Sequence, residues 1–181
     1  MKLRLNRIAA GDTHHELRFR PGALPRLAEL IAADQGTVSA SLDLSRVEDI
    51  VEVRGAVRAS LTLPCTRCLE PTAWTLDETF TAAQAPVEWQ RRLGEEVQLT
   101  GSDLDLDFFE GDELDLGQLL EEHVLLNLPQ SLYCRDKCAG LCPGCGRNLN
   151  QSECICPPQP KDHPFAGLRA LLNDTKRNHQ R

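Results

Sequence analysis

Aromatic residues are scarce in this chain, at 4% of 181 residues. Proteins that bind single-stranded nucleic acid stack successive bases on aromatic side chains, so we do not expect an extended stacking platform. The chain also lacks an uninterrupted run of about 18 to 20 apolar residues, which a membrane-spanning helix requires. Lys2, Arg4 and Arg7 interrupt the first ten residues, which therefore do not resemble the apolar segment of a secretory signal. These absences predict a cytoplasmic protein without a membrane partner.

An excess of positive charge is also missing, because the formal net charge is −7. A broad basic surface that binds phosphates is therefore not expected, and any contact with RNA must be local or indirect, with a direct contact nearest Arg135, Lys137 and Arg147. The acidic residues concentrate in one block, which is either a solvated face or a docking surface for a basic protein partner. The block contains Asp103, Asp105, Asp107, Glu110, Asp112, Glu113 and Asp115.

Cysteine, in contrast, is abundant, with eight residues arranged as four close pairs. Without a secretory signal, disulfides are disfavoured and metal binding is the leading explanation. Four pairs match two zinc sites of four thiolates each. The short separation of the last two pairs predicts one site between them, which leaves the first two pairs for the other site. The expected ligands are Cys65, Cys68, Cys134 and Cys138 in one site and Cys142, Cys145, Cys154 and Cys156 in the other.

Thiol redox chemistry at Cys65 and Cys68 is the competing interpretation. A thioredoxin-type pair obtains its low thiol pKa at the N-terminus of a helix. Here the pair lies between two predicted antiparallel strands and Pro71 follows it, so such a helix has no room. Structural metal binding is therefore favoured over redox catalysis and over a regulatory disulfide.

Period-two alternation of apolar and polar residues predicts three neighbouring strands, at about residues 37–44, 51–63 and 74–81. Their short connections make them antiparallel. Gly55 falls within the second strand, where a bulge or bend is plausible. The segment Pro64 to Pro71 joins the second and third strands and places Cys65 and Cys68 at a hairpin tip.

Helical spacing of leucines predicts a helix over residues 23–33, and residues 84–101 show no clear period and predict a loop with a short helical piece near Trp89. Residues 103–109 predict a charged edge strand with Leu104, Leu106 and Phe108 inward. A further helix is expected from Asp115, which can cap it, to Pro129, which ends it. His123 lies on or beside the apolar stripe of this helix and is expected to be a packed or surface residue.

The predicted fold class is α+β: a bent antiparallel β-sheet with packed helices and a zinc-bound C-terminal cysteine-rich segment. We place a sheet body with helices at residues 1–128, and a cysteine-rich zinc-binding segment with a C-terminal docking helix at residues 129–181. The cysteine-rich part has too few apolar side chains to order itself by burial, so metal must hold it together. Pro164 can open the docking helix, with Phe165, Leu168 and Leu171 on its apolar face.

Four stretches, CTRCLEP, DLGQLLEEHVLLNLP, YCRDKCAGLCPGCGRNLNQSECIC and DHPFAGLRAL, together resemble the YceD-like family of large ribosomal RNA subunit accumulation proteins, in its cysteine-rich version. The resemblance extends over roughly residues 35 to 173. It implies a bacterial cytosolic protein, or a plastid relative, needed for normal accumulation of 23S ribosomal RNA. The family has no established catalytic residues, so none is expected here.

The expected function is that of a non-enzymatic ribosome-biogenesis factor with Zn²⁺ as a structural metal and no small-molecule substrate. Its expected partners are the precursor of the large-subunit ribosomal RNA, a basic large-subunit ribosomal protein, or both. Two alternatives stay open: a thiol-disulfide oxidoreductase that uses the Cys65 and Cys68 pair, and a zinc-ribbon protein-interaction adapter unrelated to ribosomes. Metal content separates the oxidoreductase from the other two, and co-sedimentation with large-subunit precursors separates those two from each other.

Overall fold

The computed structural model describes residues 2–8, 13–92 and 106–156. Contacts between residues divide the chain into two compact units, Met1–Cys138 and Ala139–Arg181. The sequence-based division after residue 128 separates a sheet body from a cysteine-rich segment and stays a prediction.

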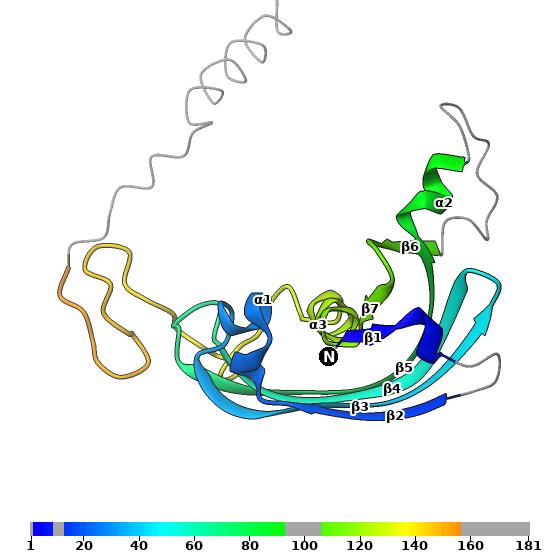
Figure 1. Cartoon of the computed structure of the whole chain (residues 1–181). Coiled ribbons are helices and arrows are strands. Elements are labelled where there is room, and N and C mark those ends of the chain that lie inside the picture. The colour runs from blue at the N-terminus through cyan, green and yellow to red at the C-terminus, as the bar shows by residue number, and fades with distance from the viewer. Residues whose placement is uncertain (1, 9–12, 93–105, 157–181) are drawn as a thin grey trace, which may run out of the picture. The chain divides into compact units, whose positions relative to one another are not determined.

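A five-stranded sheet with the order β2-β3-β4-β5-β6 forms the body of the first unit. The strands β2 to β5 pair antiparallel, each with its neighbour in sequence. Figure 1 shows that the long central strands bend together, so the sheet has a concave and a convex face. The bounds are Thr13–Phe19 for β2, Ala33–Val47 for β3, Ile50–Pro64 for β4, Pro71–Pro86 for β5 and Leu106–Phe109 for β6.

The three strands predicted from alternation are confirmed as β3, β4 and β5, and their apolar residues share the face that carries the core. The strands run further than the alternation does. On β5, for example, pairing with β4 continues to Gln84 opposite Val51, although Ala82 to Gln84 have little intrinsic strand preference. The buried residues of this face include Val38, Leu42, Leu44, Val53, Val57 and Leu61.

The edge strand β6 corrects two expectations. It pairs parallel to β5, with Ala83 opposite Leu106 and Pro86 opposite Phe109, so the sheet is not wholly antiparallel. A parallel neighbour needs a long crossover, and residues 87–105 supply its length. Phe109 is buried, whereas Phe108, expected to face inward, is exposed. Leu104, Asp103 and Asp105 lie outside the described residues.

The helix predicted over residues 23–33 is much shorter in the structure. A 3-10 turn at Pro21–Ala23 precedes α1, which covers only Pro25–Ala28. The chain leaves the helix because Ala32 already donates its N–H to the Thr62 carbonyl at 2.8 Å and β3 begins at Ala33. Sheet pairing therefore overrides the local leucine spacing.

The helix α3, Leu116–Leu126, lies on the concave face of the sheet (Figure 1). Asp115 caps it as predicted, since its carboxylate accepts hydrogen bonds from the N–H groups of Gly117 and Gln118. Buried Glu121 accepts from the N–H groups of Arg26 and Leu27, at 2.7 and 2.9 Å. This carboxylate ties α3 to the start of α1.

Short elements complete the first unit. The strands β1, Lys2–Arg4, and β7, Glu113–Asp115, form a separate antiparallel pair, and a 3-10 turn at Leu5–Arg7 follows β1. The loop predicted from residue 84 is wrong at its start, where β5 continues to Pro86, and the helix α2, Val87–Arg92, follows in agreement with the expected short helical piece. The predicted docking helix after Pro164 lies outside the described residues. Among the residues described, no helix has the length and apolar character needed to cross a membrane.

Candidate metal centres

The structure brings the eight thiols together in two groups of four. The sulfur atoms within each group all lie within 4.8 Å of one another. Cys65, Cys68, Cys134 and Cys138 form the first centre, and Cys142, Cys145, Cys154 and Cys156 form the second centre. This is the grouping that the sequence spacing predicts.

The first centre is built at the tip of the hairpin between β4 and β5. Leu69 donates its N–H to the Cys65 carbonyl at 2.9 Å, which closes a tight turn around the first cysteine pair. The second pair arrives on the chain that leaves α3, and Thr66 holds this chain by donating both its N–H and its hydroxyl to the Leu132 carbonyl, at 2.8 and 3.1 Å. Backbone pairing thus carries Cys134 and Cys138 to the hairpin.

The second centre lies in the second unit, within a compact loop. Gly146 donates its N–H to the Cys142 carbonyl at 2.8 Å, which makes a turn like that of the first centre. Gly144 lies beside the ligand sulfurs, and a Cβ atom there would make van der Waals contact with the Cβ of Cys156 at 3.4 Å. A bridge between Leu141 and Asn148 closes the base of the loop.

The two turns differ at the residue that follows the second cysteine of the motif. Gly146 occupies this position in the second centre with φ 71°, and Leu69 occupies it in the first centre with φ 63°. Left-handed backbone suits glycine and strains a leucine. Leu69 is also 62% exposed, so burial of its side chain does not compensate for the strain.

The sulfur positions fit a tetrahedral zinc ion. Four sulfurs at about 2.3 Å from zinc lie about 3.8 Å from one another. In the first centre, the Cys65 and Cys138 sulfurs are 3.8 Å apart, and those of Cys68 and Cys134 are 3.5 Å apart. In the second centre, the Cys154 sulfur lies 3.5 Å from that of Cys145 and 3.3 Å from that of Cys142. These separations are far longer than the roughly 2.05 Å of a disulfide.

The thiols of each centre ionise unequally. Burial favours the protonated form of Cys65, but backbone N–H donors, first that of Arg67, outweigh burial and lower its pKa to about 6. Burial together with the neighbouring thiols raises the pKa of Cys68 to about 12. Four thiolates this close repel one another, so full ionisation requires a cation among them.

The same inequality occurs in the second centre. The backbone N–H groups of Cys145 and Gly144 lower the pKa of Cys142 to about 6. The neighbouring thiols, first that of Cys154, raise the pKa of Cys156 to about 12. Each centre therefore has one cysteine with a lowered pKa, Cys65 or Cys142, and two whose pKa is raised, Cys68 and Cys134 in the first centre and Cys154 and Cys156 in the second.

A zinc ion held by four thiolates has no open position for water or substrate, so such a site stabilises the fold and performs no hydrolysis. The geometry shows that each tetrad could hold a metal. The first centre is mostly buried, with Cys65, Cys68 and Cys138 at 4% exposure or less, whereas Cys145 and Cys156 of the second centre are exposed.

Charged and aromatic residues surround the first centre. Arg135 pairs with Glu70 at 3.5 Å. The Arg135 guanidinium also hydrogen-bonds the Cys134 side chain, which raises the pKa of Arg135. Arg67 lies over the ring of Tyr133, with 4.5 Å between its Cζ atom and the ring centroid. The sequence gives no separate signal for Arg67 and Tyr133 beyond their position beside ligand cysteines. Arg135 and Lys137, the basic residues expected near RNA, are both exposed here, and Arg147 is exposed in the second unit.

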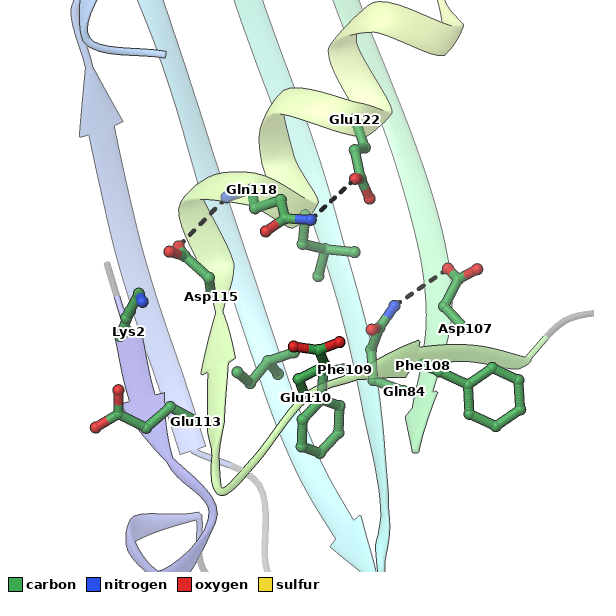
Figure 2. Close-up of a pocket in the computed structure, with 12 residues that line it drawn as sticks. Lys2, Gln84, Asp107, Phe108, Phe109, Glu110, Glu113, Asp115, Gln118 and Glu122 are labelled. Carbon is green, nitrogen blue, oxygen red and sulfur yellow. Dashed lines mark hydrogen bonds between the residues drawn. The ribbon is translucent and has the colours of Figure 1, made fainter. Parts of the chain in front are cut away.

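Asp107, Glu110, Glu113 and Asp115 of the acidic block line a hollow of about 670 Å³ between β6, β7 and α3 (Figure 2). Three of the five carboxylates of the block that the structure describes have structural partners. Asp107 accepts a hydrogen bond from Gln84, Glu113 pairs with Arg4, and Asp115 caps α3. The block is therefore partly a network within the fold and not solely a solvated face.

His123 of α3 stacks on Phe80 with ring centroids 4.0 Å apart, and burial lowers the pKa of His123. This confirms His123 as a packed residue.

Comparison with known proteins assigns the family. The model of the family described as "Large ribosomal RNA subunit accumulation protein YceD" matches residues 53–172, which include both cysteine tetrads. The chain belongs to the YceD family. The match agrees with the resemblance seen in the cysteine motifs.

Curated relatives of this YceD family member occur in plants and bacteria. It is 28% identical over 160 residues to the protein named "Large ribosomal RNA subunit accumulation protein YCED homolog 1, chloroplastic" of Zea mays, with coverage of 76% of this chain and 52% of the relative. It is 27% identical over 159 residues to the protein of the same name of Arabidopsis thaliana, with coverage of 76% of this chain and 49% of the relative. An uncharacterized protein of Mycobacterium tuberculosis is 36% identical over 141 residues, with coverage of 70% of this chain and 64% of the relative.

The chain thus spans about half to two thirds of the length of these relatives. No solved structure matches it at a significant level.

Proposed function

We propose that this protein is a non-enzymatic, cytoplasmic factor that supports accumulation of 23S ribosomal RNA and assembly of the large ribosomal subunit. The observation that carries the proposal is the family match over residues 53–172, since the family description names accumulation of large-subunit ribosomal RNA. Because the identity to the plant homologues is low, their shared name supports a role in accumulation of large-subunit ribosomal RNA. It does not indicate which step of RNA processing or assembly is involved.

Two structural zinc ions are part of the proposal. Cys65, Cys68, Cys134 and Cys138 hold one ion, and the remaining four cysteines hold the other. Zinc supplies folding free energy on the order of 10 kcal/mol per site. It orders a segment whose described regular pairing is a single bridge between Leu141 and Asn148. Closed tetrathiolate sites support a binding role over an enzymatic one.

The proposed partners are the precursor of the large-subunit ribosomal RNA, a basic large-subunit ribosomal protein, or both. The carboxylates around the hollow in Figure 2 repel phosphates and suit a basic protein. Arg135 and Lys137 are exposed at the first centre and suit a local RNA contact. The two surfaces favour different partners.

A thiol-disulfide oxidoreductase is the second candidate, because the pKa of Cys65 is lowered to about 6. Its setting disfavours that role. Cys65 and Cys68 are both buried, and the chain after them enters β5 and not a helix. A third candidate, a protein-interaction adapter unrelated to ribosomes, shares the metal sites and differs in the partner.

Depletion of the protein in the organism that encodes it tests the proposal. We expect a fall in 23S ribosomal RNA relative to 16S ribosomal RNA, and we expect the protein to co-sediment with precursors of the large subunit. A variant with Ser at both Cys65 and Cys68 should fail to restore the RNA ratio. An unchanged ratio together with no co-sedimentation would favour the adapter. Disulfide exchange catalysed by the metal-free protein would favour the oxidoreductase.

A further inference from the structure

The first centre presents a planar pair of side chains to solvent. Tyr133 is the single tyrosine of the chain and is 43% exposed. The guanidinium of Arg67, also exposed, stacks over its ring at 4.5 Å. Aromatic rings and arginine planes are the two surfaces on which proteins stack unpaired RNA bases.

The pair is held in place before any ligand arrives. Leu132, before the tyrosine, accepts the two hydrogen bonds from Thr66, and Cys134, after it, donates its N–H to the Cys65 sulfur at 3.4 Å. Arg67 donates from Nη1 to the Cys138 carbonyl at 3.1 Å. Binding a base here therefore requires little ordering of the protein, which favours affinity.

The charges around the pair nearly cancel. Arg67, Arg135 and Lys137 are countered by Glu70 and Asp136, and a zinc ion with four thiolates carries a formal charge of −2. Attraction of phosphates is therefore weak, and the flat surfaces must supply most of the affinity. A duplex hides its base faces and offers mainly phosphates and sugar hydroxyls, so this surface suits a single strand.

We infer that Arg67 and Tyr133 form a stacking site for an unpaired base of single-stranded RNA. The inference rests on the proposed function and specifies how the protein contacts the RNA. One base is engaged at this pair, which agrees with the scarcity of aromatic residues. The zinc ion acts indirectly by fixing the loops that carry the two side chains.

The test measures binding of the full-length, zinc-loaded protein to a fluorescent single-stranded oligoadenylate and to an RNA duplex of equal length. We expect preference for the single strand and a shallow dependence on salt concentration. Tyr133→Ala should weaken binding about 5- to 150-fold, as expected for loss of one stacked base. Tyr133→Phe keeps the ring and should retain the affinity. Arg67→Lys keeps the positive charge but loses the planar guanidinium, so its RNA affinity should lie between those of Tyr133→Ala and Tyr133→Phe.

Phe108→Ala is the matched control, because Phe108 is a similarly exposed aromatic on β6. It should leave the RNA affinity unchanged. Zinc content and melting temperature are measured for every variant, so that a loss of binding is assigned to stacking only where the fold and the metal are retained.

An unchanged affinity of Tyr133→Ala, or no binding of the unmodified protein to single-stranded RNA, would overturn the stacking site. Complementation of the depleted strain separates this failure from failure of the proposed function. If the unmodified protein restores 23S RNA but binds no single strand, the stacking site is wrong and the function stands. If Tyr133→Ala loses RNA binding and only partly restores 23S RNA, both are supported.

Discussion

Cys65 and Cys68 illustrate at the residue scale why metal binding must depend on pH. At neutral pH the thiol of Cys65, with a pKa of about 6, is ionised, whereas that of Cys68, with a pKa of about 12, is protonated. The pKa of Cys134 is raised by burial as well. A zinc ion that binds all four sulfurs therefore displaces at least two protons from the first centre.

We expect zinc affinity to rise with pH because protons compete for the same sulfur atoms. Two protons released per site correspond to about a hundredfold change in affinity per pH unit. This hundredfold dependence applies between the lowered pKa of about 6 and the raised pKa values above the ordinary 9.0. Below pH 6, Cys65 also takes up a proton and the loss of zinc becomes steeper. Competition with a colorimetric chelator at several pH values measures this dependence, and an affinity independent of pH would contradict it.

At the element scale, Gly55 allows β3 and β4 to approach closely, and the strand register runs through it without the bulge that the sequence suggests. It lies opposite Leu42 on β3 and Phe80 on β5. A Cβ atom at position 55 would collide with the Leu42 side chain and lie 2.8 Å from the Ser41 carbonyl oxygen. The close approach explains why a glycine interrupts an otherwise regular strand.

We predict that Gly55→Ala lowers the free energy of unfolding by about 1–3 kcal/mol, the usual cost of overpacking. Denaturant unfolding of the zinc-loaded protein measures it. Ala56→Ser, at the next position and on the opposite face, serves as the control and should change stability by less than about 0.5 kcal/mol. Equal stability of Gly55→Ala and the unmodified protein would show that the sheet relaxes without strain.

The elements differ in how well the sequence predicts them. β3, β4 and β5 follow from alternation because one face of each strand packs on a core, and α3 follows from its cap and its leucine stripe. The ends of the strands cannot be predicted from alternation, because pairing with β4 extends β5 through Ala82, Ala83 and Gln84. The direction of β6 depends on a partner distant in sequence, which a local pattern cannot show.

The same distinction applies to the candidate site. Cysteine spacing predicts the second tetrad because its two pairs are separated by only eight residues, and the first tetrad follows because only Cys65, Cys68, Cys134 and Cys138 then remain. The contact between Arg67 and Tyr133 joins residues 66 positions apart and arises from the pairing of Thr66 with Leu132. Only the folded chain reveals this contact and the difference in burial between the two centres.

At the scale of the whole molecule, the two tetrads lie in separate compact units. Each centre should therefore bind and lose its zinc ion independently of the other. Replacing Cys65 and Cys68 together with Ser should leave about one zinc ion per chain. Faster hydrogen exchange is expected in residues 130–138 and unchanged exchange in residues 142–156.

Replacing Cys142 and Cys145 with Ser is the reciprocal variant. It should also retain about one zinc ion, with faster exchange confined to residues 142–156. Metal analysis combined with hydrogen-exchange mass spectrometry compares the two proteins. Loss of both ions from either variant would show that the centres depend on each other, against their separation in the fold.

Zinc content of the purified, unmodified protein tests the central claim most directly. We predict about two zinc ions per chain, with the eight cysteine thiols protected from a thiol reagent until a chelator is added. Zinc near zero with eight freely reactive thiols, or a stable disulfide between Cys65 and Cys68, would contradict the account of two structural centres.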